Sequence, residues 1–346
     1  MNEPVRLTQF SHGAGCGCKI APAVLERILK SGTPPISDRN LLVGYGSRDD
    51  AAVYDLGNGR ALISTTDFFS PIVDDAFDFG RVAATNALSD VYAMGGRPLL
   101  AVAILGWPVE RLGPEVAQRV LEGGRRACHD AGITLAGGHS IDAPEPFFGL
   151  AVTGEVAVEH IKRNDTANAG DLLFLTKPLG LGILSTAQKR GVLEPSGTEL
   201  ATELMCRSNV FGADLGRMEG VSALTDVTGF GLGGHLLEMC DGAGLGAEIV
   251  FDHVPIIPLA RDLIAQGCYP DGSFRNWKSY GARIVGADSM VRMLVMSDPQ
   301  TSGGLLIAGR PDRSEELVRS AREFGMELGS FGRFVQRPKS GTIIVS

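Results

Sequence analysis

Aromatic residues are scarce in this sequence, and so are cysteine and net positive charge. Phe, Trp and Tyr supply 6% of the 346 residues, and six cysteines in a chain of this length are too few for a disulfide framework. This sparse cysteine content suits a reducing compartment. The formal charge of −8 disfavours nucleic acid and anionic membranes as partners, because such surfaces repel an acidic protein.

Long apolar runs are also lacking. The longest one, around Leu99 to Trp107, is too short to span a bilayer. The first residues, Met1 to Gln9, lack the apolar core of a signal peptide. These two absences predict a cytoplasmic protein with no membrane partner.

Glycine, by contrast, is abundant, with 46 residues where average usage is about 7%. The glycines are dispersed, without a repeat or a low-complexity tract. They therefore indicate many turns and close backbone or ligand approaches. The length and the apolar share of 44% predict two domains, each with a core of its own.

Segments of helix and strand character are mixed along the chain, which predicts an α/β or α+β fold. A β-hairpin is expected from Ala51 to Leu56 and Arg60 to Thr65, because Gly57-Asn-Gly59 supplies the positive φ angles of a tight turn. The run Pro98 to Leu105 reads as a buried strand because it is almost entirely apolar. The other expected helices are Phe79 to Met94, Glu115 to Ala131, Ala201 to Met218, Gly234 to Cys240 and Arg313 to Phe324, and the other expected strands are Ile133 to Ala136, Phe148 to Val156, Leu172 to Leu175, Ala247 to Phe251 and Gly304 to Ala308.

A polar segment from Lys162 to Gly170 interrupts this pattern near the middle of the chain. It predicts a boundary between an N-terminal domain, residues 1–160, and a C-terminal α+β domain, residues 161–346. Antiparallel pairing is one of the possibilities for the second domain.

Four aspartates stand at strand ends, late in a helix and before a glycine-rich turn: Asp50, Asp67, Asp90 and Asp226. Asn86 and Asp90 share one helix face, and a hairpin packed on that helix can bring the first two aspartates within reach. Oxygen ligands without nearby His or Cys are typical of magnesium, which leaves other positions to water and phosphate. The alternative is that these aspartates only cap helices and close loops.

Three glycine-containing segments are candidates for ligand contact. Thr225 to His235 leads into a helix whose unpaired amides can receive a phosphate, and it contains the dinucleotide spacing G-x-G-x-x-G. Leu135 to Ser140 puts two glycines and a hydroxyl just after a strand, where His139 either contacts a ligand or is a structural hydrogen bonder. Asp298 to Gly304 is polar and turn-forming, and packing between domains explains it as well as binding does.

Cys16 lies between two glycines, three residues before Lys19 and ahead of an expected helix. A nearby ammonium and a helix N-terminus both favour thiolate, so a nucleophilic role is chemically reasonable. Lys19 can instead serve a phosphate, although the spacing is not a Walker loop because Cys18 stands where glycine is needed. Without further paired Cys or His, C-x-C is not a convincing zinc site. The competing interpretation is a flexible, redox-sensitive terminus.

Taken together, these segments resemble the selenophosphate synthetase family, and the resemblance runs from Leu7 almost to the C-terminus. The motifs are His12-Gly-Ala-Gly-Cys-Gly-Cys-Lys19, Arg48-Asp-Asp-Ala-Ala-Val53, Thr65-Thr-Asp67, Ala84-Thr-Asn-Ala-Leu-Ser-Asp90, Gly137-Gly-His-Ser140, Thr225-Asp-Val-Thr-Gly-Phe-Gly231 and Asp298-Pro-Gln-Thr-Ser-Gly-Gly304. The aspartate and glycine motifs alone resemble the wider superfamily of aminoimidazole ribonucleotide synthetase and thiamine-monophosphate kinase. The cysteine-lysine segment separates this family from those relatives.

The resemblance implies an enzyme that converts ATP, selenide and water into selenophosphate, AMP and orthophosphate, with magnesium required and potassium assisting. It implies an aminoimidazole ribonucleotide synthetase-like fold and a homodimer whose N-terminal domains join their sheets. Selenium-delivery enzymes and selenophosphate-using enzymes are the implied protein partners.

Carried over by position, the resemblance makes Cys16 the essential cysteine and Lys19 the essential lysine. The implied metal ligands are Asp50, Asp90 and Asp226, and the implied ATP contacts are Lys19, Ser47, Arg48, Asp49, Asp67, Asp90, Gly138, His139 and Ser140. Lys19, Asp67 and residues 138–140 are candidates to act across the dimer.

Two other functions compete with this one. The chain can be a thiol carrier that captures selenium at Cys16 and Cys18 without phosphoryl transfer, although the aspartate motifs count against that. It can also be a Rossmann oxidoreductase centred on Gly229 to Gly234. Magnesium-dependent ATP binding favours the synthetase, and NAD(H) binding favours the oxidoreductase. Binding of neither nucleotide favours the carrier.

Overall fold

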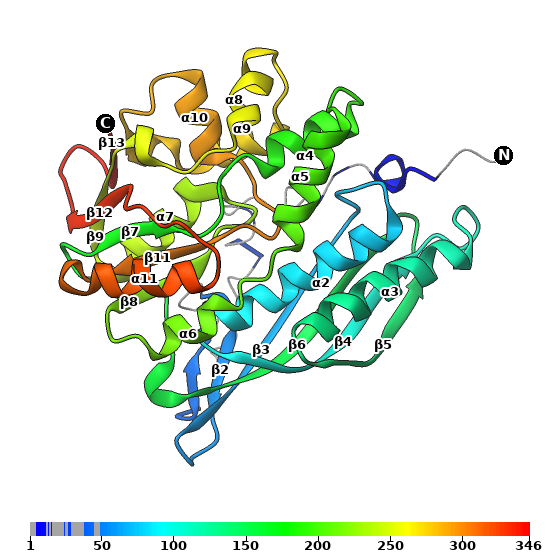
Figure 1. Cartoon of the computed structure of the whole chain (residues 1–346), viewed down its shortest axis with the longest axis horizontal. Coiled ribbons are helices and arrows are strands. Elements are labelled where there is room, and N and C mark those ends of the chain that lie inside the picture. Colours follow the sequence, from blue (N-terminus) through cyan, green and yellow to red (C-terminus); the bar gives the residue numbers. More distant parts are fainter. Residues whose placement is uncertain are drawn as a thin grey trace.

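The computed structural model describes residues 5–11, 13, 15, 24, 27, 28, 38–44 and 49–346. Two β-sheets with helices packed against them make up this part of the chain (Figure 1). The first sheet has the order β1-β2-β3-β6-β4-β5, with β1 Leu41–Val43, β2 Ala52–Asp55, β3 Arg60–Phe69, β4 Arg97–Trp107, β5 Thr134–Asp142 and β6 Phe147–Ala157. The expected hairpin is confirmed, since β2 and β3 pair antiparallel and Gly57 and Gly59 have φ angles of 79° and 80°.

Two long helices, α2 (Ala76–Ala93) and α3 (Pro114–Asp130), cover one face of the first sheet (Figure 1). The Asp75 side chain caps the start of α2 by accepting a hydrogen bond from Asp78 N at 2.9 Å. The two helices approach so closely that a Cβ built on Gly80 would lie 1.9 Å from the carbonyl oxygen of Val120. Glycine at this crossing therefore lets α2 and α3 pack backbone to backbone over the sheet.

On the opposite face of the first sheet, apolar side chains stay exposed in the part of the chain that the structure describes, and this corrects one expectation. Along β4, Ala101 and Ala103 face the helices and are buried, whereas Leu100 and Val102 are 41% and 37% exposed. The nearly continuous apolar run from Pro98 to Leu105 predicts a strand that is buried on both faces, because composition does not reveal which face of a sheet is covered. The structure instead leaves an apolar face open to solvent.

The second sheet is mixed and has the order β10-β13-β9-β12-β7-β11-β8. Its strands are β7 Leu172–Leu175, β8 Val221–Asp226, β9 Leu245–Ile249, β10 Ile284–Val285, β11 Leu305–Gly309, β12 Gly332–Gln336 and β13 Ile343–Val345. The helices of this half are α4 Leu181–Lys189, α5 Pro195–Cys206, α6 Phe211–Arg217, α7 Gly231–Ala243, α8 Pro258–Ala265, α9 Asp271–Tyr280, α10 Met290–Ser297 and α11 Ser314–Glu323. The domain boundary after His160 stays a prediction.

The single helix expected from Ala201 to Met218 is wrong, because residues 207–210 separate α5 from α6. Ser208 accepts a hydrogen bond from Val210 N at 3.2 Å, and Asn209 turns its amide toward the first domain. Short polar side chains of this kind compete with helical hydrogen bonding. Tertiary contact therefore overrides the apolar periodicity that runs through this segment.

The sheet order also removes the Rossmann alternative. A dinucleotide-binding unit places a strand, a helix and a parallel strand together in one sheet. Here β8 pairs antiparallel with β11, and β12, β7 and β11 stand between β8 and β9. The glycine spacing before α7 is therefore a helix-start turn. In the described ranges, no helix is both long and apolar enough to cross a membrane.

Candidate active site

A buried aspartate, Asp226, and three half-buried ones, Asp49, Asp50 and Asp90, meet where α2 packs against β8. Asp50 precedes β2, Asp90 lies on α2, and Asp226 ends β8. Burial raises the pKa of Asp50 well above its ordinary value, and the charges of Asp226, Asp49 and Asp90 raise it further. The structure thus brings together all three candidate metal ligands and the candidate ATP contact Asp49.

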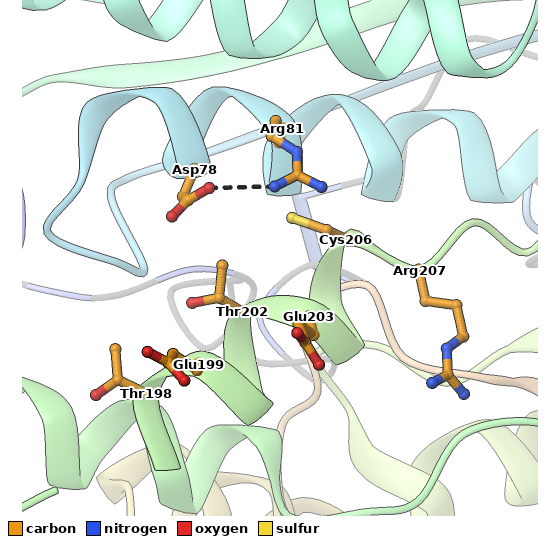
Figure 2. Close-up of a pocket in the computed structure, with 8 residues that line it drawn as sticks. All are labelled: Asp78, Arg81, Thr198, Glu199, Thr202, Glu203, Cys206 and Arg207. Carbon is orange, nitrogen blue, oxygen red and sulfur yellow. Dashed lines mark hydrogen bonds and ion pairs between the residues drawn. The ribbon is translucent and has the colours of Figure 1, made fainter. Parts of the chain in front are cut away.

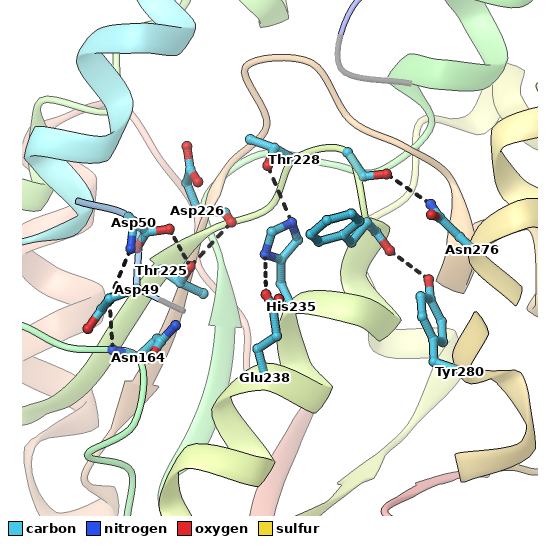
Figure 3. Close-up of polar contacts among 12 residues, drawn as sticks. Asp49, Asp50, Asn164, Thr225, Asp226, Thr228, His235, Glu238, Asn276 and Tyr280 are labelled. Carbon is cyan, nitrogen blue, oxygen red and sulfur yellow. Dashed lines mark hydrogen bonds and ion pairs between the residues drawn. The ribbon is translucent and has the colours of Figure 1, made fainter. Parts of the chain in front are cut away.

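Hydrogen bonds orient the carboxylates of Asp50 and Asp49 (Figure 3). Thr225 Oγ1 donates to Asp50 Oδ1 at 2.8 Å, and Asp49 Oδ1 accepts from the backbone N of Asn164 at 3.3 Å. Burial raises the pKa of Asp49 to about 7. The second oxygens, Asp49 Oδ2 and Asp50 Oδ2, are buried and have no hydrogen-bond partner within the described part of the chain. Buried carboxylate oxygens of this kind are suited to a cation.

The carboxylates do not form a ready-made metal cage. Among the residues that the structure describes, no three His, Cys, Asp or Glu side chains converge closely enough to hold an ion. Their mutual repulsion nevertheless shows that they lie within electrostatic range of one another. This arrangement fits magnesium, which binds through a few carboxylates and keeps water and phosphate as its other ligands.

Asp67 lies inside β3, because the strand continues to Phe69; the expectation that Asp67 ends the strand is wrong. It faces α2 and accepts a hydrogen bond from Asn86 Nδ2 at 2.7 Å. One turn along α2, Asp90 accepts from Thr65 Oγ1. The predicted shared face of Asn86 and Asp90 is confirmed by these two contacts with one strand.

The segment from Asp298 to Gly304 connects the two domains beside these aspartates. Ser302 N donates to Asn86 Oδ1 at 2.7 Å. Asn209 Nδ2 donates to Gly303 O at 2.9 Å and to Ser89 Oγ at 2.8 Å, and Ser89 Oγ donates to Asp226 Oδ2 at 2.5 Å. Packing between domains, one of the two interpretations of this motif, is therefore what the contacts show.

One functional candidate was missed from the sequence. Lys177 follows β7, is 2% exposed, and donates from Nζ to Ser302 O at 2.7 Å. Burial lowers its pKa to about 7, against the opposing attraction of Asp226. A lysine directly after an apolar strand was the available signal, because strand ends are where sites form.

Gly138, His139 and Ser140 lie within β5, so the expectation that they follow a strand is wrong. All three are exposed on the far edge strand of the first sheet. Paired residues link Asp67 to Leu150, Leu150 to Ala103 and Ala103 to Gly138. Three strand spacings, roughly 14 Å, thus separate Gly138 from Asp67 in one chain. The structure does not bring these two groups of candidate residues together.

The other predicted site residues, Cys16, Lys19, Ser47 and Arg48, lie outside the described residues. The four described cysteines are unbonded thiols, and burial raises the pKa of each. For Cys206 the pKa rises to about 11, so this thiol is protonated at neutral pH. None of these four has the lowered pKa of a reactive cysteine.

Cys206 also lines a surface hollow of about 390 Å³ between α2 and α5 (Figure 2). The hollow mixes charges of both signs, and its Arg81 already pairs with Asp78 at 3.3 Å. The full lining is Asp78, Arg81, Thr198, Glu199, Thr202, Glu203, Cys206 and Arg207. Three carboxylates against two guanidinium groups make this hollow unsuitable for a triphosphate.

Two family models cover most of the chain. The AIR synthase related protein N-terminal domain matches residues 48–156, and the C-terminal domain of the same family matches residues 168–345. Among solved structures, thiamine-monophosphate kinase from Stenotrophomonas maltophilia K279a is 20% identical with a TM-score of 0.65, covering 95% of this chain and 96% of its own. This likeness supports the same fold.

Curated relatives are much more similar. The selenide, water dikinase of Salmonella typhi is 59% identical over 334 residues, 96% of each chain. The enzyme of the same name from Escherichia coli O139:H28 is 60% identical over 331 residues, 96% of this chain and 95% of its own. With the two AIR synthase related domains, this similarity shows that the chain belongs to the selenide, water dikinase family.

Proposed function

We propose that this chain is a selenophosphate synthetase, which converts ATP, selenide and water into selenophosphate, AMP and orthophosphate. The observation that carries the proposal is the identity of about 60% to selenide, water dikinases over 96% of the chain. The buried aspartates support it independently, because an acidic site needs cations before it can hold a triphosphate.

Magnesium is the cation that these carboxylates suit best, with Asp50, Asp90 and Asp226 as its ligands and potassium as an assisting ion. Bound there, it would offset phosphate charge and help to orient the phosphoryl group. Asp49 and Asp67, together with Ser47 and Arg48, would contact ATP. Lys177 adds a buried amine that donates to Ser302 O and whose pKa burial lowers to about 7.

Cys16 and Lys19 would handle selenium and the reacting phosphate. Selenide is already a strong nucleophile at neutral pH, so these residues are needed mainly to deliver it and to exclude water from the transfer. The described thiols have raised pKa values and offer no competing delivery group within that part of the chain.

A homodimer would complete the site. Leu100 and Val102 expose an apolar sheet face, and hydrogen-bonded pairing puts His139 opposite Ile104 on that same face. Joining two such faces would cover the apolar surface and bring Gly138, His139 and Ser140 of the partner subunit toward the aspartates. The remaining elements of the proposal are a cytoplasmic location and protein partners that deliver selenium or use selenophosphate.

Phosphorus NMR of an anaerobic reaction with ATP, magnesium and selenide tests this function. We expect selenophosphate, AMP and orthophosphate in equal amounts. ADP as the final nucleotide, or no selenophosphate resonance, would contradict the proposal.

Cys16→Ser should abolish selenophosphate formation while leaving ATP affinity within about twofold of the wild type, because the thiol delivers selenium and is no phosphate ligand. Cys206→Ser is the matched control and should retain turnover. Full turnover of Cys16→Ser with selenide would remove the role assigned to this cysteine. A wild type that neither binds ATP nor transfers a phosphoryl group would favour the thiol carrier.

A further inference from the structure

Thr228, His235 and Glu238 form a hydrogen-bonded chain (Figure 3). Thr228 Oγ1 lies 3.3 Å from His235 Nε2, and His235 Nδ1 lies 3.1 Å from Glu238 Oε2. Thr228 and His235 are 4% and 7% exposed. Of the histidines that the structure describes, His235 alone is buried.

The chemistry of the three groups fixes the direction of the hydrogen bonds. An ionised carboxylate only accepts, so the proton of the neutral imidazole lies on Nδ1 and points to Glu238. Nε2 then carries a lone pair and accepts from the hydroxyl of Thr228. The oxygen of Thr228 keeps its own lone pairs for a further donor.

The surroundings hold this chain rigidly. Thr228 O accepts from Gly231 N at 3.0 Å and from Gln300 N at 2.9 Å. The Phe230 ring lies against the imidazole, with centroids 5.6 Å apart, and Tyr280 Oη donates to Phe230 O at 2.6 Å. A hydroxyl fixed in this way is suited to positioning a small ligand.

The location connects these groups to the proposed reaction. Thr228 lies two residues after Asp226, in the loop that opens α7. Backbone amides at such a helix start favour phosphate. Thr228 is therefore placed to meet a molecule that approaches a phosphate held beside Asp226.

One reactant in the proposed reaction needs a proton acceptor. Selenide is already an anion at neutral pH, whereas a water molecule must lose a proton to become an effective nucleophile. The aspartates of the cluster are already assigned to cations or to ATP. His235 is the buried imidazole nearest in sequence to Asp226. A proton can reach its Nε2 through the hydroxyl of Thr228.

We propose that Thr228 contacts the water that releases orthophosphate, and that His235 accepts a proton through it. The water oxygen bonds to the phosphorus of the departing phosphoryl group, and the bond from that phosphorus to the bridging oxygen breaks. That oxygen leaves with the nucleotide. The water's proton passes to Thr228 as the hydroxyl proton moves to His235 Nε2, and Glu238 stabilises the resulting imidazolium. His235 and Glu238 are thus positioning residues for Thr228.

Because this inference rests on the proposed function, the wild type must first produce selenophosphate and AMP in the NMR reaction. Rapid-quench measurements then compare Thr228→Val, which keeps the shape and removes the hydroxyl, with Thr228→Ser, which keeps the hydroxyl. We expect orthophosphate release to fall about 100-fold or more in Thr228→Val and to recover within about tenfold in Thr228→Ser. ATP affinity of both variants should stay near the wild-type value, whereas the thermal midpoint should fall modestly in Thr228→Val alone, because the buried Nε2 of His235 loses its donor.

Glu238→Gln offers a second measurement, because this side chain is partly exposed and its replacement is similar in shape. We expect a loss of roughly tenfold in orthophosphate release with ATP affinity unchanged, since the imidazolium loses its counter-charge. Wild-type release in Thr228→Val would overturn the inference and leave the proposed function intact. Equal losses in Thr228→Val and Thr228→Ser, with matching losses of ATP affinity and thermal midpoint, would assign the three residues a structural role and also overturn it.

Discussion

At the scale of single residues, the site is dominated by carboxylates that repel one another. Asp50 and Asp49 each keep a buried oxygen without a hydrogen-bond partner in the described part of the chain. Repulsion from Asp226 and Asp90 adds to the cost of ionising Asp50. Such a cluster is destabilising by itself and becomes favourable when cations bind.

Replacing Asp226 should therefore have opposite effects with and without magnesium. Asp226→Asn is expected to weaken magnesium-dependent ATP binding by about tenfold or more, because one ligand charge is lost. Without magnesium it should raise the thermal midpoint, since one source of repulsion on Asp50 disappears.

Calorimetric titration of ATP at several magnesium concentrations measures the first effect, and thermal unfolding measures the second. Asp252→Asn removes the same charge from an exposed position and serves as the control. ATP binding by Asp226→Asn that matches the wild type throughout the magnesium titration would count against metal ligation by this residue.

Stability should also depend on pH in a predictable direction. The pKa of Asp49 rises from its ordinary 3.8 to about 7, so the folded state holds this proton more tightly than the unfolded state. The associated stability is complete below about pH 4 and is lost as the pH rises through about 7. The metal-free protein should unfold at a higher temperature at about pH 5 than at about pH 8.

Thermal unfolding of Asp49→Asn checks this assignment, because that variant has no carboxyl to titrate and should show a weaker pH dependence. Asp55→Asn, at the exposed hairpin, is the control. A wild-type midpoint that increases steadily between those two pH values would contradict the expected sign.

At the scale of elements, β5 shows how a local irregularity positions functional residues. Its pairing with β4 shifts between Leu135 and Gly138, which is the signature of a β-bulge. A Cβ added to Gly138 would lie 2.3 Å from the carbonyl oxygen of Ala103, whereas nothing lies within 4 Å of one added to Gly137. The two glycines have similar φ angles, but only Gly138 lies in close contact with β4. Comparing substitutions at the two positions therefore distinguishes the effect of this contact from the effect of backbone conformation.

Gly138→Ala should destabilise the protein by about 1 to 3 kcal/mol, because the new methyl group forces β5 away from β4. Gly137→Ala is the matched control at a similar φ angle and should cost clearly less. Chemical denaturation of both variants measures the difference. Equal free energies of unfolding for the two would show that the close contact does not matter.

At the scale of the whole molecule, the exposed apolar face of the first sheet, which includes Leu100 and Val102, is the surface on which a second subunit is expected to pack. Ladder pairing puts Val102, Ala151 and Thr66 in one row on this face. The proposed homodimer would bury that row. A charge placed there should prevent association, because it would have to be desolvated without a partner.

We expect Val102→Lys to be monomeric and inactive but still able to bind magnesium, and we expect the wild type to be a dimer. Val192→Lys places the same charge on a different exposed valine and should remain dimeric. Sedimentation velocity together with the selenophosphate assay tests this. An active monomer of Val102→Lys would refute the need for a second subunit.

The sequence by itself was enough for the family, the mixed fold and the positions of most helices and strands. These depend on local properties such as turn glycines at Gly57 and Gly59 and the periodicity of α2, which one segment carries alone. The shared helix face of Asn86 and Asp90 also followed from helix geometry.

Only the tertiary structure decided what depends on distant segments. It ended the helix that starts before Ala201 at Cys206, buried Lys177 beside Ser302 and exposed one face of β4. It also placed two strands, β6 and β4, between Asp67 and Gly138, and linked Thr228 to His235 and Glu238. Burial, charge coupling and sheet order arise from residues far apart in the chain, so no single segment of the sequence contains them.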